Sequence, residues 1–384
     1  MKEKNTKSKQ SQILRGLPVW NLVDLYPSIS SKKIQTDLNF IRKESKFFEK
    51  KYKGKITKLS SLQLYIAITH LEKIDEIIDK ILSYSHLLIA ENTNEEKNKI
   101  FFQQMQEKIT NYHSSLIFFG LELNNIEDKK IKLLLKNSRL SKYKTWILNK
   151  RTFKPHQLDI ELEKLLQDKS ITSNGAWIRL FDETIASLEF PFKNKRLTSA
   201  EILNLLSDSK SYVRKKAAKS LGKILGQNVK LFATITNTLA KDKSVNDHWR
   251  KLPKPVSSRN LYNVVEDEVV ESLAKSVITF YPRLSYRYYS LKAKWFGVKT
   301  LKYWDRNAPL PFQSKKFYSW NDAKNIVLNS YFKFNPIIGE IAKKFFDNSW
   351  IHAPVSKGKS PGAFSASTVP SSHPYILLNF QGKA

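Results

Sequence analysis

Apolar residues spaced three or four positions apart recur along this sequence and constrain its fold more than any other feature. The clearest stretch opens at Ser60, where Gln63 stands at the third helical position and completes a capping box. The apolar residues that follow are expected to form one buried helix face, and they are Leu62, Ile66, Ile74, Ile77, Ile78 and Ile81. The fold class is therefore predicted to be mainly α.

Similar patterns predict further helices and one short hairpin. The hairpin is expected at 187–197, where apolar residues alternate around a polar tip and Pro191 favours a sheet edge. Thr198 and Glu201 form a second capping box, so a new helix is predicted to begin there. The expected helices cover about 95–118, 127–149, 156–167, 199–206, 211–241, 265–296, 321–333 and 338–348.

The C-terminal segment differs from the rest because prolines and glycines divide it into short extended runs. Residues 363–367 and 375–380 are predicted to be two strands joined by a Pro-containing turn. The second run is apolar on both faces, which is typical of a buried central strand. Since the sequence ends shortly after it, at Ala384, we expect this strand to lack covering elements and to leave an exposed apolar patch.

We divide the sequence into a tail and two larger units. Residues 1–15 are polar and rich in Lys, and they are predicted to be a mobile basic tail. The helical spacing of apolar residues ends at the hairpin, and we therefore place a domain boundary near residue 190. It separates a helical N-terminal lobe at 16–190 from a second unit at 191–384.

The net charge of +31 raises the question of a nucleic-acid partner. The basic residues are mostly Lys and are spread along the whole sequence, whereas base and phosphate readout favours clustered Arg. The absence of Cys excludes disulfides and thiolate metal ligands. No apolar run reaches signal-peptide length or the ~18 residues of a membrane span. We therefore expect a cytoplasmic protein with no specific nucleic-acid partner and no membrane partner.

Seven stretches, taken in order, resemble oligoendopeptidase F, a branch of the M3 zinc metallopeptidases related to thimet oligopeptidase. They are Trp20–Tyr26, Lys241–Arg250, Val265–Leu273, Tyr281–Tyr289, Trp304–Pro311, Trp350–Phe364 and His373–Lys383. The resemblance implies a helical N-terminal lobe plus the start of a helical metallopeptidase catalytic domain, with a small β-sheet at the C-terminal end. It also implies hydrolysis of short oligopeptides, which would enter a deep channel between the two lobes.

The sequence departs from that family at the zinc site. In the family, the strand that matches Tyr375–Phe380 leads to a helix bearing H-E-x-x-H, whose two His bind zinc and whose Glu is the general base. Here the seven His include no pair four positions apart, and none precedes a Glu. We therefore expect no catalytic residue, no metal ligand and no specifically bound zinc. The sequence is interpreted as the N-terminal part of a peptidase, inactive alone, with a complementary C-terminal fragment as its partner.

The resemblance does supply candidate substrate-binding residues. Gly362, Ala363 and Phe364 would lie on an edge strand that pairs with the backbone of an extended oligopeptide. Gly362 would allow that backbone to approach closely. The alternative is an ordinary edge strand that begins with a turn glycine.

Other residues that could carry chemistry are interpreted as structural. His248, His352 and His373 have no acidic partner at metal-ligand spacing, so each is expected to be a hydrogen-bonded structural histidine. The acidic run at 266–271 lies where a helix is predicted to begin, and the helix dipole favours negative charge there.

Each of two basic segments has a functional and a purely structural interpretation. The alternating Tyr and Arg side chains at 283–289 could grip single-stranded nucleic acid, but a half-buried helix face with Arg stems along it is the preferred interpretation. Lys357 and Lys359 flank Gly358 without a phosphate-binding motif, so a solvated basic loop is expected.

Two other classes of function stay open at this point. One is a non-catalytic module that retains only peptide binding, and it predicts binding without turnover. The other is a basic helical nucleic-acid binder, which predicts an affinity that falls steeply as salt rises.

Overall fold

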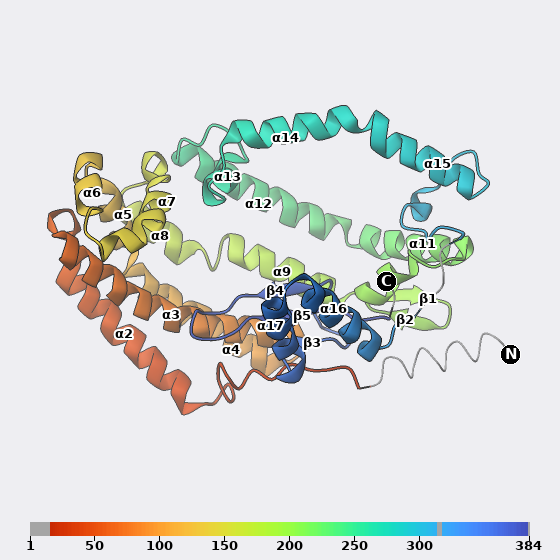
Figure 1. Cartoon of the computed structure of the whole chain (residues 1–384), viewed down its shortest axis with the longest axis horizontal. Helices are drawn as coiled ribbons and strands as arrows, with labels where there is room; N and C mark the ends of the chain where they lie inside the picture. The colour runs from red at the N-terminus through yellow and green to blue at the C-terminus, as the bar shows by residue number, and fades with distance from the viewer. Residues whose placement is uncertain (1–15, 313–316, 383–384) are drawn as a thin grey trace.

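The computed structural model describes residues 16–312 and 317–382, so the predicted basic tail at 1–15 lies outside the described residues. Most of the described chain is helical, and its strands are short (Figure 1). The helices are α2 (Lys32–Tyr52), α3 (Ser61–Glu91), α4 (Glu96–Ser114), α5 (Ile117–Asn125), α6 (Asp128–Leu134), α7 (Lys144–Arg151), α8 (Ile160–Lys169), α9 (Asn174–Ser187), α10 (Ser199–Leu205), α11 (Ser211–Gln227), α12 (Val229–Trp249), α13 (Ser257–Tyr262), α14 (Asp267–Phe280), α15 (Arg287–Trp295), α16 (Trp320–Phe334) and α17 (Pro336–Asp347). The strands are β1 (Phe190–Phe192), β2 (Lys195–Leu197), β3 (Ile351–His352), β4 (Phe364–Ala366) and β5 (Tyr375–Leu377).

The longest helix, α3, begins as predicted but buries a different face near its start. Ser60 accepts from the N–H of Gln63, and the Gln63 side chain accepts from the N–H of Ser60, which confirms the capping box. The prediction that Leu62 and Ile66 are buried is wrong, because they are 45% and 46% exposed. The first turns bury Leu64 and the residues in register with it, since apolar residues occur on both sides of the helix there and packing against α2 selects one side.

Several predicted helices are divided into shorter ones. The expected helix at 211–241 is α11 and α12, because the Asn228 side chain donates to the carbonyl of Ile224 and caps the end of α11. The expected helix at 265–296 is interrupted at Pro282, whose ring lacks an N–H, by a π-helical turn at Pro282–Tyr286. The expected helix at 127–149 is α6 and α7, with a 3-10 turn at Leu140–Tyr143 between them.

The predicted hairpin is confirmed. Strands β1 and β2 pair antiparallel, with Pro191 opposite Arg196. The second capping box, of Thr198 and Glu201, opens α10 as expected. A small core of Phe190, Ile202 and Ala217 joins the hairpin to α10 and α11.

The C-terminal strands form a three-stranded sheet in the order β3-β5-β4. The central position predicted for β5 is confirmed, while the sequence patterns missed β3, which runs parallel to β5. The expectation that β5 lacks cover is wrong. Tyr375 and Leu377 are both 0% exposed, because they join the main core formed by α2 to α7.

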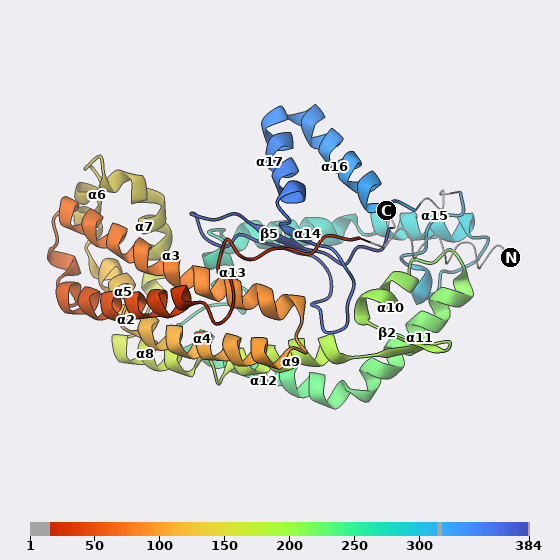
Figure 2. The same ribbon diagram turned by 90° about the horizontal axis from the view of Figure 1, so that it is seen from below.

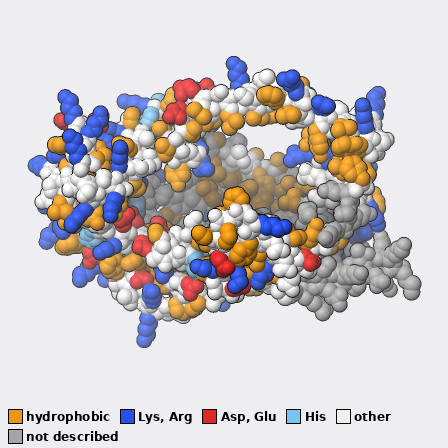
Figure 3. Space-filling view, viewed as in Figure 1, with side chains coloured by type: hydrophobic (Ala, Val, Ile, Leu, Met, Phe, Trp, Pro, Cys, Tyr) orange, Lys and Arg blue, Asp and Glu red, His pale blue; other side chains and the backbone are white. Residues whose placement is uncertain are grey.

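The exposed apolar surface lies on α14 to α17 instead. Helices α14 and α16 contain no buried residue, and α16 and α17 pack mainly on each other. Figure 2 shows this helix pair standing away from the other elements, and Figure 3 shows hydrophobic side chains along α14 and α15 beside an opening. The preferred interpretation of 283–289 as a half-buried face is therefore wrong, since Tyr286 is 61% exposed.

No helix in the two described stretches, 16–312 and 317–382, is long and apolar enough to span a membrane.

Candidate functional site

The edge strand β4 presents unpaired backbone groups on one side. The N–H of Ile376 donates to the carbonyl of Trp350, just before β3, and that of Leu378 to the carbonyl of His352 in β3, so the groups of Tyr375 and Leu377 face β4. Register then pairs Phe364 with Leu377 and Ala366 with Tyr375. Because direction alternates along a strand, the N–H and C=O of Ser365 point to the free edge, where no described strand lies.

The three predicted substrate-binding residues lie in sequence at the start of this edge. Ala363 continues the outward alternation of Ser365, and both residues are exposed. Phe364 pairs inward with β5 and its side chain packs against the main core. Sequence reasoning therefore missed Ser365, and the alternation of strand groups is the signal that identifies it once the pairing is known.

Gly362 turns the chain into β4. Its φ of +82° lies in the left-handed region that favours glycine, and an added Cβ would meet no atom within 4 Å. The Asn379 side chain donates to the carbonyls of Ser360 and Gly362 at 3.1 and 2.9 Å, which fixes the turn against the end of β5. The turn is thus held on one side and open on the other.

Two titratable side chains from distant helices lie beside β4. The His86 ring on α3 is 5.9 Å from the Phe364 ring, and Asp182 on α9 interacts with His86 electrostatically. Displacement of water by the protein lowers the pKa of His86 and raises that of Asp182, although part of each side chain is exposed. No sequence motif links these residues, because they meet only through the packing of α3, α9 and the sheet.

Lys359 is buried, so the expected solvated loop is wrong at this position. It is 5% exposed, and its Nζ contacts the Nδ1 of His352 at 2.8 Å. Lys357, two residues earlier, does lie at the surface, where it pairs with Glu189 at 2.8 Å. The identical side chains differ because the chain turns at Gly358, whose φ is +79°.

The structural interpretation of His352 and His373 is confirmed. The Nε2 of His352 lies 3.6 Å from a Glu91 oxygen, while the Nε2 of His373 lies 3.0 Å from Asp24. The His373 ring also stacks on Trp350 with the centroids 3.6 Å apart. The two imidazoles therefore have separate protein partners.

His248 and the acidic run complete the predicted set. His248 is exposed on α12, so the expectation that it is a packed, hydrogen-bonded histidine is wrong. Asp267 accepts from Ser257 and Asn260, each at 2.8 Å, and these hydrogen bonds lower its pKa. Its carboxylate thus joins α13 to the first turn of α14, and the structural interpretation of this run is confirmed.

The described residues offer the polar edge of a strand. Among them, no group of three or more His, Cys, Asp or Glu side chains is placed to hold a metal ion. The side chains present do not fit a zinc site of the H-E-x-x-H type, because no His pair has the required spacing. Recognition of an extended peptide backbone is the chemistry that this arrangement supports.

Comparisons with known proteins point to one group of peptidases. A family model described as Oligopeptidase F matches residues 122–190. Oligopeptidase PepF of Bacillus subtilis is 26% identical over 378 residues, which are 94% of this chain and 54% of that protein. Group B oligopeptidase PepB of Streptococcus agalactiae is 26% identical over 337 residues, covering 84% of this chain and 55% of that protein. The chain thus spans about half the length of these curated relatives.

Solved structures show the same fold. Oligoendopeptidase-F from Enterococcus faecium superposes with a TM-score of 0.67 at 20% identity, covering 83% of this chain and 60% of that one. A peptidase structure from Chlamydophila abortus gives a TM-score of 0.62 at 18% identity, covering 95% and 62%. The mainly α fold with a small C-terminal sheet is therefore shared with these proteins.

Proposed function

Because this chain belongs to the oligoendopeptidase F family of M3 peptidases, we propose that it forms a substrate-binding wall of an oligopeptidase. Extended oligopeptides bind along the free edge of β4 in this proposal. The observation that carries it is the outward direction of the backbone groups of Ala363 and Ser365 beside an open turn at Gly362. A peptide that adds a strand there gains main-chain hydrogen bonds whatever its sequence.

The neighbouring side chains limit what such a peptide can present. Side chains of an added strand alternate between the two faces of the sheet, so every second one is directed toward the helices behind β4. Phe364 and His86 provide an apolar surface on that side, with Asp182 near it. We infer a preference for apolar or basic side chains at alternate peptide positions.

Substituting proline for Ser365 tests the edge directly. Proline lacks the outward N–H and is tolerated on an edge strand, so S365P is expected to weaken peptide binding about tenfold while the fold persists. The matched control is S365A, which keeps the N–H. Fluorescence anisotropy with a labelled nine-residue peptide measures both, and equal affinities for S365P and S365A would contradict the proposal.

Hydrolysis is proposed to depend on groups that this chain does not carry. M3 oligoendopeptidases are zinc enzymes, and the sequence contains no H-E-x-x-H. We expect the purified chain to bind zinc without defined stoichiometry and to leave a quenched fluorogenic oligopeptide intact. Stoichiometric zinc together with chelator-sensitive cleavage would overturn this part of the proposal.

The proposed partner is a polypeptide equivalent to the part of the relatives that this chain does not span. Two observations support it. Helices α14, α16 and α17 expose large apolar side chains, among them Leu273 at 65%, Phe334 at 79% and Ile337 at 71%. A cavity of about 940 Å³ between α11 and α15 is also lined mainly by apolar residues. Surfaces of this kind are typical of protein interfaces.

The same activity assay identifies that partner. The coding DNA downstream of the Ala384 codon is read in all three frames for an H-E-x-x-H segment, and the encoded polypeptide is added to the chain. Chelator-sensitive hydrolysis that requires both polypeptides is the expected result. Peptide binding without turnover in the mixture would instead favour a non-catalytic binding module.

A further inference from the structure

The Lys359 ammonium has several polar contacts within the protein, unlike a lysine in a solvated surface loop. Its Nζ lies 2.8 Å from Nδ1 of His352, 2.6 Å from the carbonyl oxygen of Pro354 and 2.9 Å from that of Leu378. The carbonyl of His352 itself is 3.3 Å away. A lysine ammonium has three N–H groups, and here each can reach one of the three nearer acceptors. The ammonium thus joins β3, the loop after it and the residue that follows β5.

The loop that contains Lys359 leads directly into β4. Gly358 is held from the other side, because the N–H and hydroxyl of Thr93 donate to its carbonyl at 2.7 and 2.8 Å. The N–H of Ser360 donates to the carbonyl of Ala90 at 2.9 Å. The end of α3 and the Lys359 ammonium therefore fix the loop at consecutive residues, two to four positions before Gly362.

His352 connects the ammonium to a carboxylate. If Nδ1 of the neutral imidazole accepts from Lys359, then Nε2 carries the proton and faces Glu91. Trp20 donates to the other Glu91 oxygen at 2.7 Å. Burial alone would raise the pKa of Glu91, but the nearby His352 ring and the hydrogen bond from Trp20 outweigh it and the pKa is lowered. The carboxylate is therefore ionised when the ammonium is present.

Loss of one proton from Lys359 breaks one of these hydrogen bonds. A neutral amine has two N–H groups, so one of its three acceptors loses its donor. If His352 instead turned its proton to Nδ1, its Nε2 lone pair would face the Glu91 carboxylate. Burial lowers the pKa of Lys359 to about 8, and attraction to Glu91 opposes this only in part. The loss of this proton, and of the hydrogen bond with it, is therefore expected just above neutral pH.

We infer that Lys359 is the positioning residue of the β4 edge, and that its protonation regulates peptide binding there. The charged ammonium holds the loop so that Gly362 turns correctly and the groups of Ala363 and Ser365 stay directed outward. This inference rests on the proposed peptide-binding function of β4. The charged or titratable side chains placed against Lys359 are Glu91 from α3 and His352 from β3, whereas Lys357 is directed to Glu189.

Peptide affinity as a function of pH tests the inference on the full chain. Between pH 7 and pH 9.5, wild-type affinity for the labelled nine-residue peptide is expected to fall about tenfold, as one of the ammonium hydrogen bonds is lost. K359M is expected to bind weakly at both pH values, so its plot of affinity against pH should lack the inflection that the wild type shows. The matched control K357M removes a lysine from the surface of the same loop and is expected to follow the wild type.

E91Q is a second variant that keeps the lysine. It retains an oxygen acceptor for Trp20 but removes the charge that favours the ammonium, so the inflection is expected to move to lower pH. This shift distinguishes positioning by a charged group from a general loss of packing, which would leave the inflection where it was. An unchanged inflection in E91Q, or wild-type binding by K359M at both pH values, overturns the inference.

A measurement without peptide separates this inference from the proposed function. In the peptide-free chain, the ¹⁵N signal of the Lys359 side chain is expected to titrate near pH 8 in the wild type and in K357M, and this signal is absent from K359M. If that titration is seen while no variant binds peptide at any pH, the binding role of β4 fails and the regulatory inference fails with it, leaving Lys359 as a structural contact. If the titration is absent while peptide binds, only the inference fails.

Discussion

Replacing Arg214 with methionine is expected to lower the free energy of unfolding by about 3–5 kcal/mol, the largest effect that we predict for a single substitution. Arg214 is 1% exposed on α11. Its Nε and Nη2 donate to one Asp305 oxygen at 3.1 and 2.5 Å, and its Nη1 donates to the carbonyls of Asp208 and Ser209 at 2.7 and 3.1 Å. Methionine would remove the charged partner and both Arg214 donors from one Asp305 oxygen, and would leave the two carbonyls without this donor.

The control and the double variant isolate the cause. Lys216 lies exposed on the same helix, so K216M is expected to change stability by no more than about 0.5 kcal/mol. Adding D305L to R214M removes the carboxylate that was left unpaired, so the double variant is expected to recover part of the loss. Urea unfolding followed by circular dichroism measures all three. A loss below about 1 kcal/mol for R214M would contradict burial of this pair.

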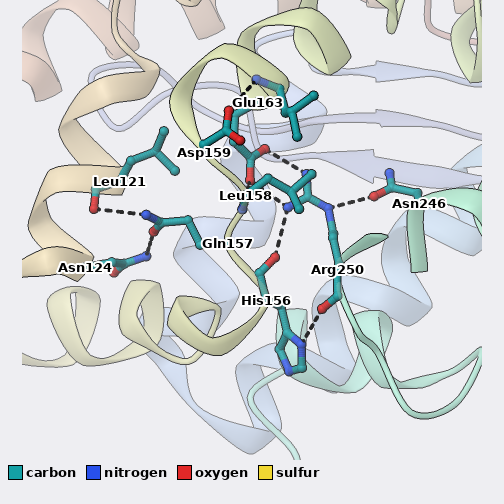
Figure 4. A network of polar contacts seen from close by, with 10 residues as sticks. Leu121, Asn124, His156, Gln157, Leu158, Asp159, Glu163, Asn246 and Arg250 are labelled. Carbon is teal, nitrogen blue, oxygen red and sulfur yellow. Dashed lines mark hydrogen bonds and ion pairs between the residues drawn. The ribbon is translucent and has the colours of Figure 1, made fainter. Parts of the chain in front are cut away.

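Replacing Arg250 with methionine is expected to cost about 2–4 kcal/mol and to loosen the attachment of α12 to α8. Figure 4 shows the network around Arg250. Its two terminal nitrogens donate to the two Glu163 oxygens at 2.7 Å each, and its Nε donates to Asn246 at 2.7 Å. The carbonyl of Arg250 contacts the His156 ring at 2.8 Å. The effect is smaller than at Arg214 because the Arg250 and Glu163 side chains are 24% and 15% exposed.

Limited proteolysis reports this loosening better than global unfolding does. Cleavage in the connection between α8 and α9 and at the end of α12 is expected to accelerate in R250M, because local opening becomes more frequent there. The matched control is K243M, which removes an exposed pair between Lys243 and Asp247 on the same helix and is expected to have little effect. Identical cleavage rates in R250M and K243M would show that the network does not hold α12.

The family and the fold class were accessible from the sequence, and the comparisons confirm both. The resemblance rests on stretches that occur in a fixed order along the sequence. The expected domain boundary near residue 190 and the roles of Gly362, Ala363 and Phe364 remain predictions. The register of β4 adds Ser365 to that set, and only the pairing with β5 identifies it.

The sequence by itself determined features whose causes are local. The capping boxes at Ser60 and Thr198 locate helix starts because side chain and backbone three residues apart satisfy each other. Pro282 also interrupts a helix through its own ring, a local cause that the prediction of one helix at 265–296 overlooked. The apolar character of β5 predicted its central position, since a strand apolar on both faces requires neighbours on both.

Only the tertiary structure decided which side chains are buried and which meet. Leu62 and Ile66 have helical spacing, yet packing against α2 leaves them exposed. Lys357 and Lys359 are the same residue type two positions apart, but only Lys359 is surrounded by acceptors from β3 and from the residue that follows β5. Burial and polar contact are set by segments far away in the chain, as the separation of 91 positions between Arg214 and Asp305 illustrates. A local pattern carries no information about such a partner.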